Sequence, residues 1–413
     1  MRKAHALLLS LLFAPAAMAV TVTIGNRVTA NAGVAVSATP RTTVDLVHPA
    51  THTGTLDTAR LEWSATCSNA VKVKFFRRAG DTMTMTAERG PFSTLVAAFQ
   101  VALSPPVQVQ QGDLIGVTSL GNCGSPVALG GTESEGYFQY DGDVTGTVAF
   151  SGVVASQVAD TLAVSASGTA TERTERVVPV VGSVQGNFGS NFKTEMQIFN
   201  PADETVQYRL VFRRAGVAGA PTDAFQDVPV GAKSTVKFTD IVATMGQSGL
   251  GSLDLIVPAG QVVPVIAARV FNDAGAAGAS GLSEEGVPVP LPDEGLTGTN
   301  VLRRGVTGYL IMPVNQGKTR FNVGVRTLDA GATILIKTRN MFGVTIGNRS
   351  VGFPPHYFIQ TDVASFTDTT FFSGSDSVEI TVIYGSIIVY GASTDNTTND
   401  PSVQFARGVF SVF

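Results

Sequence analysis

Apolar and polar residues alternate along most of this chain, and a helical period is never sustained for more than a turn or two. In residues 61–65, for example, apolar Leu61, Trp63 and Ala65 alternate with polar side chains. A period of two places successive side chains on opposite faces of a strand. Only 15% of the residues are charged, while 44 are Gly and 20 are Pro, which is typical of strands separated by frequent turns. The sequence therefore predicts an all-β protein.

The alternating runs are short, and turn-forming residues separate them. Val71–Phe75 and Thr82–Thr86 alternate on either side of an Ala-Gly-Asp turn, which predicts a β-hairpin. Short strands separated by Gly, Pro and Asp turns are typical of β-sandwiches and jelly rolls. We therefore expect tandem β-sandwich modules, the first of which is jelly-roll-like.

The first 19 residues have the features of a secretory signal peptide. Arg2 and Lys3 precede an apolar run over residues 4–13, and residues 17–19 offer small side chains at a cleavage site. This run is too short to cross a bilayer core about 30 Å thick. We expect a mature chain that begins at Val20 and is secreted, periplasmic or at the cell surface, with no transmembrane helix.

The rest of the chain is longer than one typical domain, and two segments indicate boundaries within it. Residues 165–176 are polar and have little to bury, which favours a boundary there. Residues 286–292 contain three prolines, which cannot donate to a β-ladder and therefore belong on an edge or in a linker. These boundaries define an N-terminal unit (residues 20–171), a middle unit (177–284) and a C-terminal unit (300–413).

The middle and C-terminal units repeat each other in four blocks, which keep their order at offsets of 122 to 129 residues. Each repeat is expected to contain a short helix, capped by side-chain oxygens of Thr239-Asp240 in one unit and of Thr361-Asp362 in the other. The corresponding blocks are Phe192–Ile198 with Phe321–Thr327, Phe238–Ala243 with Gln360–Ser365, Gly251–Leu255 with Asp376–Ile380, and Val265–Arg269 with Val389–Ser393.

Two of these segments resemble a repeat found in exported, acidobacterial-type bacterial proteins that are largely uncharacterised. Phe192–Glu195 with Ile198–Pro201 resembles the opening block of that repeat, and Tyr390–Pro401 resembles its closing block. The first repeat keeps only Asn272-Asp273 of the closing block. The resemblance covers roughly residues 177–407 and implies a β-sandwich on the cell exterior without an established activity.

The mature chain contains two cysteines, Cys67 and Cys123. In an oxidising compartment, a single pair is most simply interpreted as one disulfide. Closing a loop of roughly 57 residues would stabilise the fold by at most about 4 kcal/mol in the chain-entropy account. The alternative is two buried free thiols.

The residues that could do chemistry do not form a recognisable catalytic pattern. Three histidines follow the signal peptide, namely His48, His52 and His356, and no Gly-x-Ser-x-Gly motif presents a serine. We expect His48 and His52 to be exposed loop residues and His356 to lie in a turn. A Phe-Arg-Arg-Ala-Gly pentapeptide occurs at Phe76–Gly80 and again at Phe212–Gly216, where we expect hairpin ends with solvated charge.

Calcium is the one ligand that the sequence suggests. Asp395, Asn396, Asn399 and Asp400 bring side-chain oxygens together within six residues, and calcium takes six to eight oxygen ligands. Asn and Asp also favour turns for local reasons, because their side chains bond the nearby backbone. We expect a turn here, with a calcium site as the alternative. Asp141-Gly142-Asp143 is a smaller candidate of the same kind.

Charge and composition limit the classes of partner that we expect the protein to bind. Without the signal peptide, 26 basic residues face 32 acidic ones, so the basic surface that a nucleic-acid partner needs is not expected. The sequence favours a non-catalytic exported or cell-surface protein with a structural, adhesive or binding role, whose partner would be a cell-envelope protein or a polysaccharide. No cofactor is expected.

Three alternative functions stay open at this point. A carbohydrate- or calcium-dependent recognition module would be favoured by exposed aromatic platforms at Tyr357-Phe358 or at Tyr137–Tyr140. A small outer-membrane β-barrel protein would fit the alternating C-terminal residues 409–413, which end in Phe. A hydrolase with a site assembled from residues that no motif marks is the third.

Overall fold

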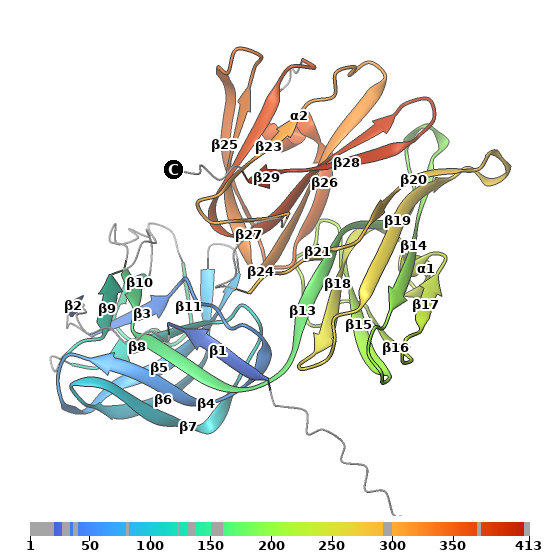
Figure 1. The fold of residues 1–413 in the computed structure, drawn as a ribbon. Helices are drawn as coiled ribbons and strands as arrows, with labels where there is room; N and C mark the ends of the chain where they lie inside the picture. Colours follow the sequence, from blue (N-terminus) through green and yellow to red (C-terminus); the bar gives the residue numbers. More distant parts are fainter. Residues whose placement is uncertain are drawn as a thin grey trace, which may run out of the picture.

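The structure is a computed structural model that describes residues 20–26, 34–35, 40–79, 82–121, 124–130, 137–149, 160–291, 300–369 and 373–408. These residues form an all-β fold, as predicted: the strands pair antiparallel into sheets, and the helices are single turns (Figure 1). The predicted signal peptide and residues 409–413 lie outside the described residues. In the described part of the chain, no helix has the length and apolar character needed to cross a membrane.

The N-terminal unit contains two large sheets and one small one. Its strands are β1 (Thr21–Gly25), β2 (Val34–Ala35), β3 (Arg41–Asp45), β4 (Thr53–Trp63), β5 (Cys67–Ala79), β6 (Thr82–Thr94), β7 (Ala97–Val109), β8 (Leu114–Ser119), β9 (Val127–Gly130), β10 (Tyr137–Asp141), β11 (Thr147–Ala149), β12 (Asp160–Leu162) and the first part of β13 (Val164–Gln185). One sheet joins β1, β4, β7 and β13, the second has the order β10-β3-β8-β5-β6-β11, and the small one has the order β12-β9-β2. The predicted hairpin is confirmed by the pairing of β5 with β6.

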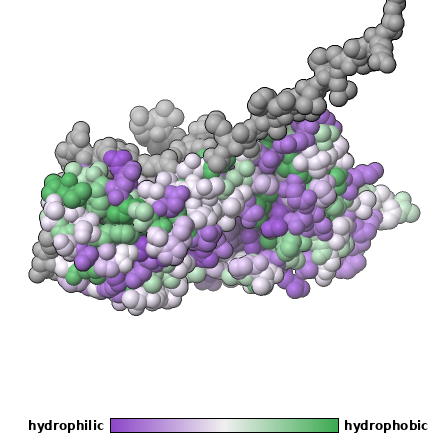
Figure 2. All heavy atoms as spheres, turned by 90° about the horizontal axis from the view of Figure 1, so that it is seen from below, coloured by the Kyte–Doolittle hydropathy of each residue, from purple (hydrophilic) through white to green (hydrophobic). Residues whose placement is uncertain are grey.

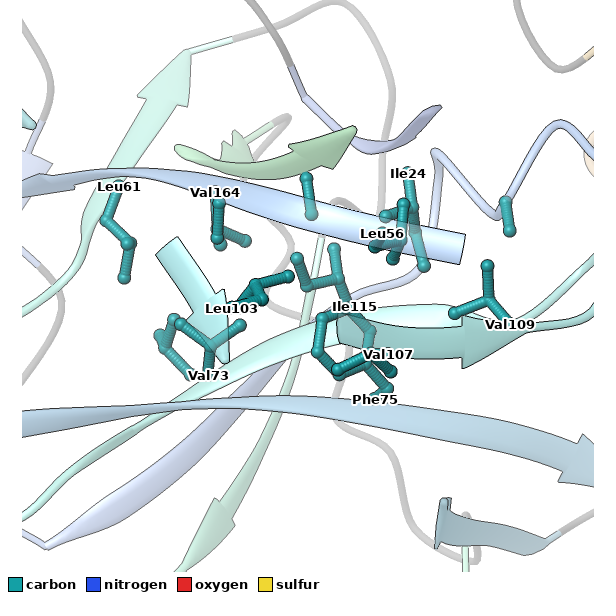
Figure 3. Close-up of a cluster of buried hydrophobic side chains, with 14 of the residues drawn as sticks. Ile24, Leu56, Leu61, Val73, Phe75, Leu103, Val107, Val109, Ile115 and Val164 are labelled. Carbon is teal, nitrogen blue, oxygen red and sulfur yellow. The ribbon is translucent and has the colours of Figure 1, made fainter. Parts of the chain in front are cut away.

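Alternate side chains of the two large sheets meet in one core. Because every second residue of a half-buried strand faces inward, the apolar positions of the alternating runs face each other. Burial of this apolar surface is what holds the layers together. Side chains from both sheets that are at most 1% exposed include Ile24, Leu56, Val73, Phe75, Ile115 and Val164 (Figure 3).

Strand β13 passes through the segment where the sequence predicts a boundary. Its first half pairs with β1 and β4, and its second half pairs with β18 (Gly249–Pro258) and β21 (Val287–Pro288). Arg173 and Thr174, near its middle, are only 7% and 8% exposed. The expectation that this segment has little to bury is therefore wrong. It is one strand shared by two units, and its polar side chains are covered where the units meet.

The middle unit is built around two sets of paired strands. Strand β14 pairs with β17 and β19, while β15 pairs with β16 and β18. The elements are η1 (Asn187–Gly189), β14 (Asn191–Phe199), β15 (Val206–Arg214), β16 (Phe225–Val230), β17 (Thr235–Phe238), α1 (Ile241–Thr244), β18, β19 (Val265–Asp273), η2 (Gly275–Ala277), β20 (Ala279–Glu284) and β21.

The C-terminal unit has a similar pattern of strand pairing, but its strands are longer. The first part of β24 pairs with β26 and with the second part of β27, and the second part of β24 pairs with β25 and with the first part of β27. The elements are β22 (Val301–Arg303), β23 (Thr307–Ile311), β24 (Thr319–Arg339), β25 (Thr345–Phe353), β26 (Phe358–Asp362), α2 (Val363–Thr367), β27 (Ser377–Asp395), β28 (Pro401–Phe405) and β29 (Arg407–Gly408).

Both short helices begin as predicted. The carboxylate of Asp240 accepts a hydrogen bond from the backbone nitrogen of Ala243 at 3.1 Å, and that of Asp362 accepts one from Ser365 at 2.9 Å. Each bond satisfies a backbone donor that has no partner within the helix. The two aspartates therefore cap helices at the same place in the two strand orders.

Strand register places the last of the four sequence blocks differently from the prediction. Met196 lies opposite Ala268 in the middle unit, and Val325 lies opposite Val389 in the C-terminal unit. If Met196 corresponds to Val325, as the first block predicts, then Ala268 corresponds to Val389. The sequence alignment had matched Val389 with Val265, three residues earlier. A shift of three residues exchanges the two faces of a strand, which the sequence does not reveal because residues 265–268 and 387–390 are all apolar.

The C-terminal unit lies against both other units (Figure 1). Strand β24 contacts β5 of the N-terminal unit, and β26 contacts β18 of the middle unit. The proline-rich connection is an edge segment, as predicted, because β21 pairs with β13. Val287 and Val289 of this connection are buried with Ile388 of the C-terminal unit. The three units therefore share covered surfaces.

Candidate functional site

Each unit holds an arginine–carboxylate pair across neighbouring strands, next to the end of a hairpin. Two of the arginines belong to the repeated Phe-Arg-Arg-Ala-Gly pentapeptide. The expectation of solvated charge is wrong for Arg78 and Arg213, which are 5% and 8% exposed, because the C-terminal unit covers both hairpins. The pairs are Arg77–Asp113 (2.8 Å), Arg213–Asp254 (2.7 Å) and Arg339–Glu379 (2.6 Å).

In the middle unit, the carboxylate of Asp254 is shared by two arginines. Arg213 of β15 reaches one of its oxygens, and Arg326 of β24, from the C-terminal unit, pairs with the other. The Nε of Arg326 also donates to the hydroxyl of Ser252 at 2.7 Å. The side chains of Arg326 and Asp254 are both 0% exposed. A charge-assisted network thus crosses the boundary between two units inside the protein.

The network sets the charge state of its members. Burial raises the pKa of Asp254, but the charges of Arg326 and Arg213 outweigh burial and hold this pKa well below its usual range. Arg213 has a further partner, because its NH1 donates to Asp223 at 2.6 Å. The two buried arginines therefore face a carboxylate, that of Asp254, which stays ionised, and this is the condition for a buried charge to be tolerated.

His356 and Asp329 extend the network towards the N-terminal unit. The Nδ1 of His356 lies 3.7 Å from Asp254, and its Nε2 lies 3.6 Å from Asp329. Burial, with the nearby charge of Arg213, lowers the pKa of His356 to about 3. Burial raises the pKa of Asp329 to about 6. His356 lies in a turn, as predicted, and it is neutral at pH 7, but its carboxylate neighbours were not foreseen.

Two glycines allow the N-terminal and middle units to pack closely against Asp329 and His356 of the C-terminal unit. A Cβ atom on Gly112 would lie 2.3 Å from the Cβ of Asp329, and one on Gly219 would lie 2.3 Å from the Cβ of His356. Real Cβ atoms do not approach that closely, so loops of the N-terminal and middle units reach the C-terminal unit only because these positions lack a side chain. All three units therefore meet here. The junction cluster is formed by Arg213, Asp254, Arg326, Asp329 and His356.

The charged groups of the junction cluster bind other groups of the protein and so join its units. Fully buried Arg326 and Asp254 cannot touch a dissolved ligand, and each charge is directed at a group of the protein. Only the side chains of His356 and Asp329, 24% and 18% exposed, reach the surface in part. A buried pair of this kind makes the joined arrangement strongly dependent on each partner, so we interpret the cluster as a device that fixes the units relative to one another.

The two remaining histidines lie in a loop, as predicted, but neither is fully exposed. His48 has a side chain 22% exposed, and its Nδ1 lies 3.4 Å from Asp45. His52 is partly buried and its Nδ1 lies 3.0 Å from the hydroxyl of Thr51. Across the described ranges, no group of three or more His, Cys, Asp or Glu side chains is placed to hold a metal ion.

The calcium candidate residues form a turn that already holds a cation of the protein. Arg320 donates to the side-chain oxygen of Asn399 at 2.8 Å and to that of Asn396 at 3.3 Å. The carboxylate of Asp395 accepts two backbone hydrogen bonds from within the turn, from residues 397 and 398, both at 2.8 Å. The backbone of Asp395 donates to the carbonyl of Asp400 at 3.1 Å. The turn that we expected is present, and calcium binding stays the alternative.

The smaller acidic cluster is also directed at cations of the protein. Asp143 lies 2.8 Å from the Nζ of Lys72 and 2.6 Å from that of Lys74, which is fully buried. Asp141 lies 2.7 Å from Arg41. These carboxylates therefore stabilise the N-terminal unit through ion pairs with its own strands.

Cys67 is 6% exposed at the start of β5, while Cys123 lies outside the described residues. The chain next to Cys123 approaches the strand that precedes Cys67. Ser64 donates its backbone hydrogen bond to Ser125 at 3.0 Å, and Trp63 forms a bridge with Pro126. The disulfide between Cys67 and Cys123 stays a prediction that this placement favours.

The aromatic residues proposed as a carbohydrate platform are mostly buried. Phe358 is 0% exposed, Tyr137 is 8% and Phe138 is 7%. Tyr357 stacks on Phe353 with ring centroids 5.8 Å apart, and Tyr140 alone is classed as exposed, at 42%. The proposed residues therefore do not form an exposed platform together.

The sequence analysis noted Arg213 only as part of the repeated pentapeptide, and it did not single out Asp254 or Arg326 as charged site residues. A signal for two of them was present, because Asp254 stands between Leu253 and Leu255 and Arg326 ends an apolar alternation. A charged residue within an otherwise buried strand needs a partner. Which partner it meets depends on the packing of separate units.

No protein-family model, no curated protein and no solved structure shows a significant match to this chain. The functional conclusion therefore rests on the geometry of the junction cluster and on the features of the sequence.

Proposed function

We propose that this protein is a non-catalytic exported or cell-surface protein in which three β-sandwich units form one rigid body with a structural, adhesive or binding role. The observation that carries the proposal is the fully buried Arg326–Asp254 pair, which joins two units. Strand β13, which the N-terminal and middle units share, supports it. Units connected in this way present their surfaces at fixed distances, whereas units on flexible linkers move independently.

We further propose that the middle and C-terminal units are copies of one sandwich. The support is the matching order of strand pairs and the capped helices at Asp240 and Asp362. The resemblance to exported repeat proteins favours the same interpretation. A cell-envelope protein or a polysaccharide is the proposed partner class.

Two titratable groups at the edge of the junction cluster support a structural role. His356 and Asp329, whose pKa values are shifted, face Asp254 and the arginines that neutralise it. In an enzyme, such groups would be aimed at a substrate. Here their neighbours are other parts of the protein.

Expression of the full chain in a bacterial host, followed by fractionation and intact-mass measurement, tests the export part of the proposal. We expect a mature protein that begins at Val20 in the periplasm or the medium. Cytoplasmic protein that retains residues 1–19 would contradict export.

The non-catalytic part is tested with the purified mature protein on panels of ester, glycoside and peptide substrates. We expect no turnover above background. Turnover that is lost in His356→Gln while the protein stays folded would contradict the proposal, because the junction would then be an active site.

A further inference from the structure

An apolar contact joins the middle and C-terminal units beside strand β20. Phe405 of β28 packs against two clusters of buried side chains, and each cluster contains residues of both units. Strand β20 contacts β28 at this place (Figure 1). The inter-unit seam is defined by Val180, Val270 and Val287 of the middle unit and by Ile388, Tyr390 and Phe405 of the C-terminal unit.

Glu284 places a carboxyl group at this seam. It is the last residue of β20, lies opposite Ala268 of β19 and is 8% exposed. Burial, and after it the charge of Glu284, raises the pKa of Tyr390, so the two side chains lie close together across the seam. Among the described residues, no group donates a hydrogen bond to either carboxylate oxygen of Glu284. An ionised Glu284 would therefore be a buried charge without a partner.

In the described part of the chain, the strands around Glu284 direct no cation at it. Strand β28 has no titratable side chain, and on β27 the hydroxyl of Tyr390 donates to a residue of its own unit at 2.8 Å. Arg269 of β19 pairs with Glu195 at 3.3 Å, and Arg176 of β13 donates to a backbone carbonyl at 3.4 Å. The closed seam therefore favours the neutral form of Glu284.

This preference makes the seam sensitive to pH. Burial raises the pKa of Glu284 to about 8, whereas water would return it towards the ordinary 4.5 if the seam opened. Between these two pKa values the open state binds fewer protons than the closed state, so a rise in pH favours opening. Above about pH 8 the carboxylate is ionised in both states, and the effect levels off.

The junction cluster keeps its charges where Glu284 titrates. The charges of Arg326 and Arg213 hold the pKa of Asp254 well below its usual range, so this carboxylate stays ionised. The pKa of His356 is about 3 and that of Asp329 is about 6, so both groups have released their protons at the pH at which Glu284 ionises. The two units are therefore still joined at the junction cluster when the seam responds to pH.

We propose that the inter-unit seam opens and closes with pH: it is closed while Glu284 is neutral, and it opens when this carboxylate ionises and turns to water. Opening separates β20 from β28 and exposes apolar side chains of the seam, while the junction cluster holds the units together. This goes beyond the structural role proposed above, because the relative position of two units then depends on the pH of the medium.

Hydrogen–deuterium exchange of the mature protein tests the proposal at about pH 6.5, 8.5 and 9.5, with labelling times scaled to the intrinsic exchange rate. Among the described strands, β20 pairs only with β19 and β28 only with β27, so both can fray once the seam opens. We expect their amides to exchange at least tenfold faster at the second pH than at the first, and no faster at the third. The amides of β18 and β24, which carry Asp254 and Arg326, should not change.

Variants at two neighbouring residues identify the group that titrates. Glu284→Gln and Glu284→Met both remove the titrating carboxyl, and both should abolish the pH dependence in β20 and β28. Glu285→Gln is the matched control, because Glu285 is exposed, and it should behave like the wild type.

Three outcomes would overturn the proposal. The first is wild-type exchange in β20 and β28 that does not change with pH. The second is an equal rise in either Glu284 variant, because another group would then be responsible. The third is an equal rise in β18 and β24, because the whole protein and not the seam would then respond.

Discussion

The middle and C-terminal units hold the same kind of ion pair in opposite surroundings. In the middle unit, the side chains of Arg213 and Asp254 are 9% and 0% exposed, and a second unit covers them. In the C-terminal unit, the side chains of Arg339 and Glu379 are 32% and 10% exposed, and no other unit covers them within the described residues. Two similar cross-strand pairs thus differ in burial because a neighbouring unit covers only one. The local sequence supplies the ion pair, and the packing of units decides how much the pair contributes to stability.

The largest expected effect comes from breaking the covered pair. Asp254→Asn removes the charge that two arginines share, and we expect it to lower the free energy of unfolding by about 3–5 kcal/mol, since a buried charge is left without its partner. Glu379→Gln should cost about 1 kcal/mol or less, because its partners Arg339 and Lys337 are 32% and 31% exposed and keep access to water. Denaturant unfolding of both variants measures the difference. Equal effects would mean that burial does not distinguish the two pairs.

A covalent link is predicted only for the N-terminal unit, which contains both cysteines of the chain. Reduction of the predicted bridge between Cys67 and Cys123 should lower stability by up to about 4 kcal/mol. Intact mass before and after reduction with alkylation shows whether the bridge exists. Two thiols that alkylate without reduction in periplasm-expressed protein would refute it.

A buried carboxylate without an arginine gives the opposite case to Asp254. Glu284 is 8% exposed, and within the described structure neither of its carboxylate oxygens has a hydrogen-bond partner. Burial raises its pKa from 4.5 to about 8. The folded state therefore holds a proton that the unfolded chain releases, and stability falls as the pH rises from about 4.5 through 8.

Glu284→Gln should remove this loss of stability at high pH. We expect the variant to be more stable than the wild type at pH 8 by about 1–3 kcal/mol, because an amide carries no charge to bury. At pH 4 the two proteins should melt alike. Thermal melts at both pH values make the measurement. A variant that is less stable at pH 8 would indicate a partner for the ionised carboxylate.

If the middle and C-terminal units are copies, removing either helix cap should lower the free energy of unfolding by the same amount. Asp240→Ala and Asp362→Ala each remove one bond to a backbone nitrogen, and each should cost about 1 kcal/mol. Chemical denaturation of the two variants compares them. A loss of stability in one variant that is several times the loss in the other would show that the two helices contribute differently to the stability of their units.

The smallest expected effect concerns calcium. Because Arg320 already binds Asn396 and Asn399, millimolar calcium or EDTA should leave the melting temperature unchanged in the wild type and in Asp395→Ala. A bound ion at a hundredfold excess over its dissociation constant would add about 2.7 kcal/mol. A calcium-dependent rise of several degrees that Asp395→Ala abolishes would therefore identify a metal site in this turn.

The sequence by itself determined the all-β fold, the hairpin of β5 with β6, the turn at His356 and the caps at Asp240 and Asp362. These features depend on side-chain alternation and on bonds between residues close in the chain, and both can be read from neighbouring residues. The register of the last repeat block was misplaced, because residues 265–268 and 387–390 are all apolar and carry no alternation that fixes it.

Only the tertiary structure decided which charges are buried and which units meet. Arg326 finds Asp254 more than 70 residues away in sequence, and β13 crosses the segment where a boundary was expected because strands of the N-terminal and middle units both pair with it. Arg213 and Arg339 occupy similar strand positions, yet one lies in the junction cluster and the other lies next to the exposed residues Met341 and Phe342. The physical reason is that burial depends on what the rest of the chain places on a surface, and a local pattern contains no information about that cover.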